Sequence, residues 1–419
     1  MGPPRPTMNL ERRRLVQIAT ASMLLAAGAT QTACSGRSSY DAAAADTWRR
    51  VAPDGVPDAQ VLRELARYAT LAANGHNTQP WRFELGREVV TLRPDMTRRT
   101  PAVDPDDHHL WISLGCATEN LLQAARAFGR TGEVGVDERG VHVALRPGAA
   151  ERTVLFEAIV DRQCTRSPYD GRALTREELE RLDAASASPR VRAIWLTTPQ
   201  RLEGLAELVG RGVQAQMADA AFVLELKQWI RFDYADAVAS RDGLFSGASG
   251  NPTLPAWLGR ALFDRFFTVE SELKKYAGQL RSSAGAVVFL GEREDADHWV
   301  EVGRAYQRFA LQATAMDIRN AFVNQPVEVP AVRSELAQWL GAGSARPDLV
   351  VRFGRTTLVA TAGGSRRDLG VDLGTRRAAR RRHRDRVRPP RRRVPTDCGH
   401  HRARRRRERV GTSRAVRLP

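Results

Sequence analysis

The amide and hydroxyl groups of Asn77, Thr78 and Gln79 stand in a row in a short loop and could bind a flat heteroaromatic ligand. Such a ring presents acceptors and an N–H donor along its edge, and these side chains offer groups of both kinds. Gly75 can adopt the left-handed conformation that closes a helix, and Trp81 can bury a large ring beneath the loop. A polar turn over a core tryptophan explains the same residues equally well.

Arg162 and Arg166 form a second candidate site, because their side chains would converge if the segment between them is helical. Two guanidinium groups in that arrangement match a terminal phosphate dianion, since each can donate paired hydrogen bonds. Thr165 adds a hydroxyl group to the same stretch. The alternative is a solvated helix end, because arginine is abundant throughout this chain.

Both stretches resemble motifs of the nitroreductase family of FMN-dependent oxidoreductases. Residues 75–83, GHNTQPWRF, resemble the N-x-Q-P-W loop, and residues 162–166, RQCTR, resemble the R-x-S/T-x-R phosphate signature. Cys164 stands where that family has serine or threonine, so Thr165 would supply a replacement hydroxyl. The sequence of the loop most resembles that of the Acg branch of the family, in which two nitroreductase-like halves lie on one chain. The resemblance covers roughly residues 58–371 and is more specific than a glycine pattern.

This resemblance implies FMN as the cofactor and assigns residues around it. Contacts to the ring or the ribityl chain are assigned to Gly75, His76, Asn77 and Gln79. Contacts to the phosphate are assigned to Arg162, Cys164, Thr165 and Arg166, with Arg366 and Arg367 as helpers. Gln325 lies in a turn that, in relatives, brings backbone N–H groups near the reactive flavin nitrogen. The cofactor performs the redox chemistry, so we assign no catalytic side chain and no metal.

The implied activity is electron transfer from NAD(P)H to a small acceptor such as a nitroaromatic compound or a quinone. A protein of another class also fits, one that sequesters or stores FMN under an occluding lid and turns over little. Eight of the 27 aromatic residues lie between Trp229 and Phe267, and glycines break this region into short pieces. Such inserts are typical of a lid over a planar cofactor. An aromatic satellite core that bridges the two halves is an equal alternative.

Hydrophobic periodicity predicts an α+β fold. We expect helices at 58–73, 104–129, 151–161, from 175 behind a capping box, from 201 and at 296–317, and strands at 83–85, 89–92, near 134, and at 141–145, 191–196, 287–290 and 349–354. The resemblance implies mixed, mainly antiparallel sheets flanked by helices, in two halves that form an internal pseudo-dimer and hence a monomer. We place the first half at 58–200, a helical insert at 201–270 and the second half at 271–371.

An internal repeat at a constant offset of 188 residues agrees with a duplicated half. Gly115 matches Gly303, and Ala125 matches Ala313. Alanine-rich helices produce such matches by chance, so the repeat alone is weak evidence.

Both ends of the chain lie outside the resemblance. Residues 1–40 carry three arginines at 12–14 before a mildly apolar stretch, which resembles a twin-arginine signal for export of folded proteins. Cys34 stands in a lipoprotein-like cleavage box, so we expect a cell-envelope protein, attached to the membrane if Cys34 is lipidated. A disordered basic tail with an alanine-rich helix, on a cytoplasmic protein, is the alternative. Residues 372–419 are arginine-rich, lack hydrophobic periodicity and are expected to be disordered.

The net charge of +17 does not indicate nucleic-acid binding, because it is unevenly distributed. Residues 356–419 hold 21 arginines and five acidic residues, a net +16, which leaves about +1 for the rest of the chain. No aromatic platform interleaves those arginines. The four cysteines show no paired spacing, which argues against a disulfide framework or a zinc site. His108 and His109 are adjacent, and such pairs are more often solvated than metal-binding.

Overall fold

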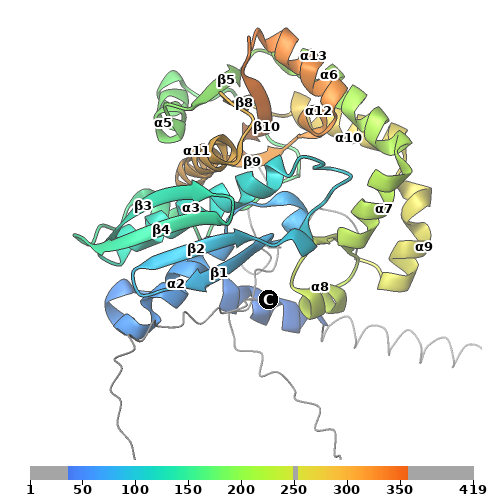
Figure 1. Ribbon diagram of the computed structural model, residues 1–419. Helices are drawn as coiled ribbons and strands as arrows, with labels where there is room; N and C mark the ends of the chain where they lie inside the picture. Colours follow the sequence, from blue (N-terminus) through green and yellow to red (C-terminus); the bar gives the residue numbers. More distant parts are fainter. Residues whose placement is uncertain (1–35, 249–252, 357–419) are drawn as a thin grey trace, which may run out of the picture.

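The computed structural model describes residues 36–248 and 253–356. The predicted export motif with Cys34, the helper residues Arg366 and Arg367, and the arginine-rich tail lie outside these residues. The described chain begins with a helix over residues 36–47 and the short turn η1 (Pro53–Gly55). It then forms two four-stranded sheets with helices packed on and between them (Figure 1).

The first sheet has the polar loop at the start of one edge strand. Its order is β1-β2-β4-β3, and every pairing is antiparallel. The strands are β1 (Trp81–Leu85), β2 (Val89–Pro94), β3 (Arg130–Asp137) and β4 (Gly140–Pro147), with η2 (Gly75–Asn77) and η3 (Met96–Arg98) beside them. Alternate residues such as Phe83, Leu92 and Val143 pack against α2 (Asp58–Thr70) and α3 (His108–Ala127) in the central core.

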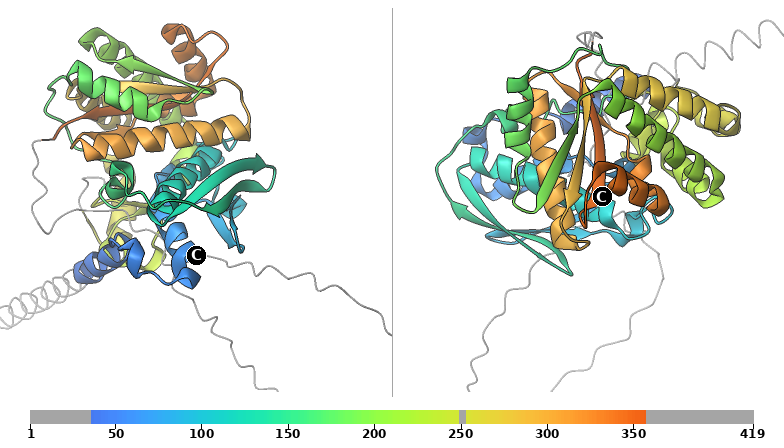
Figure 2. Two further views of the ribbon diagram at one scale, coloured as in Figure 1. Left: turned by 90° about the vertical axis from the view of Figure 1, so that its left-hand side faces the viewer. Right: turned by 90° about the horizontal axis from the view of Figure 1, so that it is seen from above.

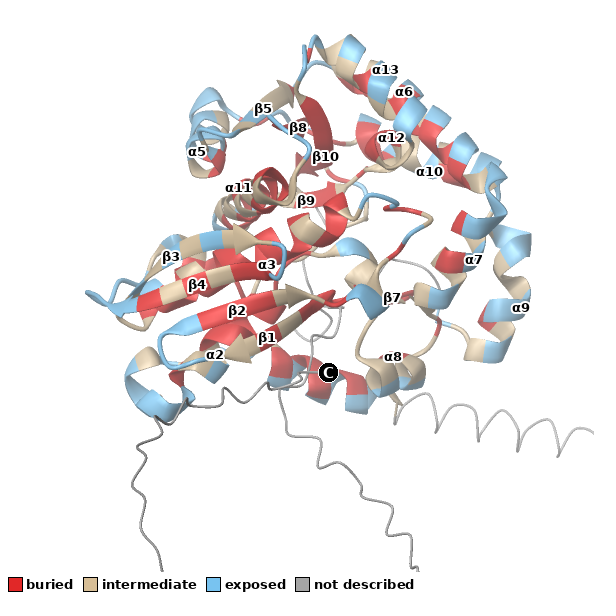
Figure 3. Cartoon of the chain, in the orientation of Figure 1, coloured by how far each residue is buried: buried red, intermediate tan, exposed pale blue. Residues whose placement is uncertain are grey.

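The second sheet repeats this topology. Its order is β5-β8-β10-β9, so the first, second, fourth and third strands in sequence are again neighbours. The strands are β5 (Val191–Leu196), β8 (Gly285–Gly291), β9 (Arg319–Phe322) and β10 (Arg346–Gly354), all antiparallel. Every residue of β8 and β10 is buried (Figure 3). Phe289 faces the central core and Val288 faces a second core, which explains the continuous apolar runs.

Helices enclose the second sheet on both faces. One face packs against α11 (Ala296–Ala315), which is flanked by α4 (Val154–Ala158) and α5 (Arg176–Ser186). The other face packs against α6 (Pro199–Ala218), α10 (Val269–Arg281), α12 (Gln325–Glu328) and α13 (Pro330–Leu340). The predicted capping box of Thr175 and Glu178 opens α5.

Two predicted segment boundaries differ from the structure. β5, which we placed in the first half, pairs with β8 of the second sheet. α6, which we placed in the insert, contributes Leu205 and Val209 to the second core. Contacts between segments far apart in the chain determine both boundaries, and a local sequence pattern does not reveal such contacts. The insert itself runs through α7 (Ala220–Trp229), β6 (Ile230–Arg231), α8 (Tyr234–Ser240), β7 (Leu244–Phe245) and α9 (Ala256–Phe266).

The two halves meet where α3 packs against α11 (Figure 2). A Cβ atom at Gly115 would lie 2.1 Å from the carbonyl oxygen of Val300, and one at Gly303 would lie 2.1 Å from that of Ile112. Ile112 and Val300 are also 188 residues apart, so the contact is reciprocal under the sequence offset. With the repeated strand order, this contact makes the chain the predicted internal pseudo-dimer.

An aromatic satellite core joins the insert to the helix at 36–47. The ring of Tyr40 lies 5.5 Å from that of Tyr234 and 4.8 Å from that of Phe245, measured between centroids. This core connects the insert to the N-terminal helix. The aromatic core that we considered as an alternative to a lid would instead have bridged the two halves. Within the described residues, no helix combines the length and apolar character needed to cross a membrane.

Candidate functional site

A hollow of about 680 Å³, partly open to solvent, lies where the two predicted motifs meet. Its walls come from residues 70–74 with Asn77, residues 162–164 with Arg166, the insert residues Leu244 and Ala248, and Trp48 and Phe322. None of these lining residues is acidic. The hollow is therefore polar and cationic near the arginines and apolar where the leucine and aromatic side chains lie.

The polar loop is held in a strained backbone conformation. His76, Asn77 and Gln79 have φ values of 47°, 51° and 52°, in the left-handed region that residues other than glycine rarely adopt. Each such residue costs about 1–3 kcal/mol, and they concentrate at functional sites. Gly75, which we expected in this conformation, does not adopt it. The reason is that α2 already ends at Thr70, so the reversal falls on the residues after Gly75.

Hydrogen bonds within the loop and to the insert fix this conformation. Asn74 Oδ1 accepts the backbone N–H of Gln79 at 2.9 Å. Asn77 Nδ2 donates to the carbonyl oxygen of Gly243 at 3.1 Å, and Gln79 Nε2 donates to that of Arg241 at 2.6 Å. The insert therefore rests directly on the loop.

Of the four residues predicted to contact a ring or ribityl chain, Asn77 lines the hollow. Gln79 is 2% exposed, and its amide is directed at the insert. The backbone N–H of Gly75 donates to Ser113 Oγ at 3.3 Å. Burial, together with the positive charge of Arg166, lowers the pKa of His76 to about 4, so its imidazole is neutral near pH 7.

The arginine stretch reaches the hollow without the helix on which the expected convergence of its side chains depended. Residues 162–166 are not helical. Cys164 forms an isolated parallel bridge with Asn320 at β9, and the N–H of Thr165 donates to the Asn320 carbonyl oxygen at 2.9 Å. This long-range pairing replaces the local helix, yet Arg162 and Arg166 both line the hollow.

The guanidinium of Arg162 has unsatisfied hydrogen-bond donors. Its side chain is 6% exposed, and Nη2 donates to the carbonyl oxygen of Leu71 at 3.1 Å. Nε and Nη1 are buried and have no hydrogen-bond partner among residues 36–248 and 253–356. A buried donor without an acceptor costs about 1–3 kcal/mol, and more when it is charged. An anionic group bound in the hollow would satisfy these donors.

Three further residues were predicted to contact the cofactor: Cys164, Thr165 and Gln325. Cys164 lines the hollow. Thr165 does not line it, and its backbone is engaged by Asn320. Gln325 begins α12 and packs against Gly212 of α6, so it too lies outside the lining set.

Most of the apolar wall was not predicted from the sequence. Leu244 and Ala248 lie in the segment that we interpreted as a lid, so glycine-broken aromatic composition did mark their region. Phe322 lies just before the turn that contains Gln325, which is a weak positional signal. Nothing in the local sequence distinguishes Trp48.

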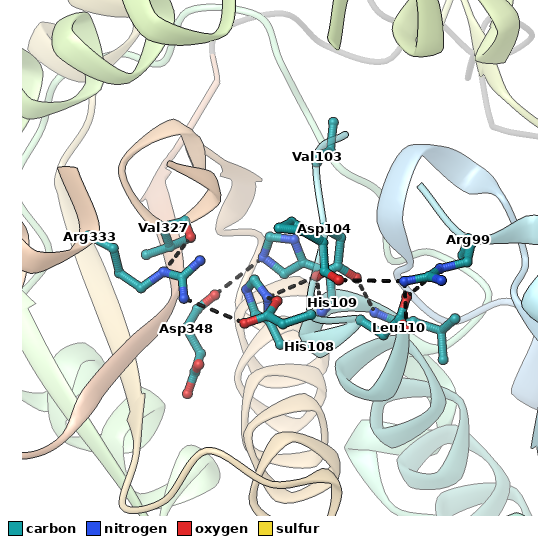
Figure 4. Close-up of polar contacts among 12 residues, drawn as sticks. Arg99, Val103, Asp104, His108, His109, Leu110, Val327, Arg333 and Asp348 are labelled. Carbon is teal, nitrogen blue, oxygen red and sulfur yellow. Dashed lines mark hydrogen bonds and ion pairs between the residues drawn. The ribbon is translucent and has the colours of Figure 1, made fainter. Parts of the chain in front are cut away.

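A buried ion-pair cluster lies at the start of α3 (Figure 4). His108 and His109 are 0% and 8% exposed, so the prediction that they are solvated is wrong. His108 Nδ1 lies 2.8 Å from Asp104 Oδ1 and 2.7 Å from Asp106 Oδ1. Asp104, His108 and His109 place ligand-type atoms within 4.8 Å of one another, a spacing that a metal ion could use.

Existing contacts account for this cluster without a metal. Asp104 caps α3 by accepting two backbone N–H groups at 3.1 and 3.0 Å. Arg346 donates to Asp106 at 2.6 Å, so a further cation would lie beside a guanidinium. Although burial opposes the charge, hydrogen bonds to Asp104 and Asp106 raise the pKa of His108. We therefore assign the cluster a structural role, because it connects α3 of the first half to β10 of the second.

Comparison with known proteins finds relatives that are similar in sequence over most of the chain. No family model matches the chain. Two curated proteins of Mycobacterium tuberculosis, Rv3131 of strain H37Rv and MT3217 of strain CDC 1551, are named as candidate NAD(P)H nitroreductases and are similar to it. Each is 26% identical over 312 residues, which covers 71% of this chain and 86% of the relative.

Solved nitroreductase structures match a smaller part of the chain. A nitroreductase with bound FMN from Bacteroides fragilis is 15% identical and covers 48% of this chain and 88% of its own, with a TM-score of 0.30. The NADPH:FMN oxidoreductase from Vibrio harveyi, complexed with NAD+, is 11% identical and covers 49% and 70%, also with a TM-score of 0.30. These partial matches add nothing to the assignment from sequence. The similarity to the mycobacterial proteins extends over most of both chains, and it supports the nitroreductase family for this chain.

Proposed function

We propose that this protein is an FMN-dependent oxidoreductase that takes electrons from NAD(P)H and delivers them to a small acceptor, such as a nitroaromatic compound or a quinone. The observation that carries the proposal is that the buried Nε and Nη1 of Arg162 have no hydrogen-bond partner in the described part of the chain, beside a hollow without acidic walls. The names of the mycobacterial relatives support NAD(P)H as the donor and nitro compounds as acceptors.

The residues of the hollow fit a flavin that carries a phosphate. Arg162 and Arg166 would bind the phosphate through charge-assisted hydrogen bonds. Leu71, Leu244 and Phe322 offer apolar surface to a planar ring. When bound, FMN supplies the hydride-accepting and electron-donating chemistry that the protein's own side chains lack.

Cofactor content tests this proposal directly. Heat release followed by chromatography should yield FMN and no FAD, because the hollow offers an arginine pair and the chain has no dinucleotide-type glycine fingerprint after a strand. Recovery of FAD would overturn the proposal. So would failure of the purified protein to take up FMN on reconstitution.

A second candidate function is sequestration of FMN with little turnover, and the position of the insert favours it. Leu244 and Ala248 line the hollow, while Gly243 is hydrogen-bonded to the loop. Arg98 donates to Asp242 at 2.9 Å and ties the same segment to the first half. An insert fixed in this position would deny a nicotinamide ring its stacking contact. The two functions therefore differ in whether NAD(P)H reduces the bound flavin.

We further propose that the protein acts as a monomer and is exported. A single chain supplies both Asn77 and Phe322, from opposite halves, to one hollow, so lining it requires no second copy. Export rests on the arginines at 12–14 and on Cys34. Fractionation of cells that express the full chain should place it in the envelope, and Cys34→Ser should release it from the membrane fraction. Recovery of the unaltered chain in the cytoplasm would refute export.

A further inference from the structure

Arg352, in β10, lies directly behind the stretch at 162–167 and is completely buried, with 0% of its side chain exposed. Its Nη2 donates to the carbonyl oxygens of Thr165 at 3.2 Å and Ser167 at 2.8 Å. Its guanidinium lies 4.0 Å from the centroid of the Tyr169 ring. One buried side chain thus holds a carbonyl group of the phosphate signature, that of Thr165, and the carbonyl group of Ser167 just after the signature.

The carbonyl group between them is held as well. Gln279 Nε2, on α10, donates to the carbonyl oxygen of Arg166 at 2.7 Å, and Arg352 Nη1 donates to the Gln279 carbonyl oxygen at 3.2 Å. The N–H of Thr165 donates to Asn320 at 2.9 Å. Three consecutive carbonyl groups are therefore fixed from β10 and α10, while the side chain of Arg166 lines the hollow.

Burying the charged guanidinium of Arg352 costs free energy. An arginine at this position therefore implies a role that an apolar residue could not perform. In the described part of the chain its partners are carbonyl oxygens, the Ser283 hydroxyl and an aromatic ring, and none is a carboxylate. Burial lowers the pKa of Arg352, and the positive charge of Arg166 adds to this effect. Even a buried ion pair can often be replaced by well-packed apolar side chains without loss of stability. An apolar side chain in place of Arg352 would lose the forked guanidinium, which donates to several backbone carbonyl oxygens at once.

We propose that Arg352 is a positioning residue of the phosphate site, which fixes the backbone of residues 165–167 so that Arg166 faces the phosphate of the ligand. This inference rests on the proposed function, because it requires a ligand with a phosphate group. Arg352 acts through Arg166 and contributes nothing to binding of the flavin ring. Its loss therefore reduces recognition of the phosphate selectively.

The test compares FMN with riboflavin, which lacks the phosphate. Full-length wild-type protein, Arg352→Met, Arg352→Lys and Arg192→Met are each titrated with both flavins, followed by flavin fluorescence. Arg192 is a matched control, because its Nη2 also donates to a backbone carbonyl oxygen, that of Ala342 at 2.6 Å, and it does not line the hollow. Arg352→Met should lower the preference for FMN over riboflavin by about tenfold, as expected for loss of a charge-assisted contact. Its riboflavin affinity and the preference of Arg192→Met should stay at the wild-type values.

Arg352→Lys carries the test if Arg352→Met does not fold, because it keeps the buried charge but cannot bridge both carbonyl oxygens. A folded Arg352 variant with the wild-type preference overturns the inference and leaves the FMN proposal intact. Equal losses of FMN and riboflavin affinity also overturn it, since they indicate a general packing role. A wild-type protein that binds FMN no better than riboflavin overturns the phosphate site itself, and the inference with it.

Discussion

Asn77 and Gly243 exchange two hydrogen bonds between the polar loop and the insert. The N–H of Gly243 donates to the Asn77 carbonyl oxygen at 3.0 Å, and Asn77 Nδ2 donates back to the Gly243 carbonyl oxygen at 3.1 Å. Gly243 has a φ of +77°, and a Cβ atom there would lie 2.4 Å from the carbonyl oxygen of Trp229. Only glycine fits this position without distortion. The polar loop and the insert are thus joined by a contact between two segments far apart in sequence.

Replacing Gly243 with alanine should loosen the insert. A left-handed alanine costs about 1–2 kcal/mol, and the clash with Trp229 adds to that strain. We therefore expect FMN to dissociate about fivefold faster or more, measured by flavin fluorescence after dilution. Gly171→Ala is the matched control, because Gly171 also has a positive φ (+74°) but lies outside the insert. Equal dissociation rates in the two variants would mean that the insert does not retain the cofactor.

Replacing Gly303 with alanine should destabilise the junction of the two halves. The new Cβ would lie 2.1 Å from the carbonyl oxygen of Ile112, so α3 and α11 must separate. Overpacking of this kind costs about 1–3 kcal/mol, which urea unfolding would measure. Gly278→Ala, in the exposed part of α10 where a Cβ meets nothing within 4 Å, should instead stabilise the protein by about 0.5–1 kcal/mol. Equal effects of the two substitutions would contradict the close helix crossing.

Replacing Arg162 with methionine should weaken FMN binding by about 1.5–3 kcal/mol, the range for hydrogen bonds to charged groups. Arg166→Ala should act in the same direction, because both side chains line the hollow. Arg176→Ala, at an exposed pair with Glu180 on α5, serves as the control and should leave FMN affinity unchanged. Unchanged affinity in both Arg162 and Arg166 variants would assign these arginines to the solvated-surface alternative.

The stability of the protein should fall in acid partly because of His109. Burial, with the positive charge of His108 adding to it, lowers the pKa of His109 from 6.5 to about 3. As the pH falls below 6.5, the unfolded chain therefore takes up a proton that the folded protein does not, and the free energy of unfolding decreases down to about pH 3. Above pH 6.5 this contribution to stability is fully present. His109→Gln should have a flatter dependence of the unfolding free energy on pH between 7.5 and 5 than the wild type; parallel curves would refute the assignment.

Hydrophobic periodicity is a local property, and it predicted the strands of the first sheet and the helices α3 and α11, but not β9, α10 or α13. It did not predict how the arginine stretch reaches the hollow, since the bridge between Cys164 and Asn320 joins residues far apart in the chain. Arg352 lies in a strand whose neighbours are apolar, and nothing nearby in sequence marks it as a contact of residues 165–167. The same reason explains β5, whose partner strand lies far away in the chain. Each of these features depends on contacts between residues far apart in the chain, and a short stretch of sequence does not reveal such contacts.

The most direct test of the account is an anaerobic absorption spectrum of the FMN-loaded full-length protein before and after addition of NADPH. If the protein is an oxidoreductase, a nicotinamide must stack on the flavin ring past Leu244 and Ala248, and the flavin absorbance should bleach within seconds. A nitroaromatic compound or a quinone should then restore it. Bleaching by dithionite but by neither NADPH nor NADH would contradict the proposed activity and favour the sequestering function, in which the insert excludes nicotinamide.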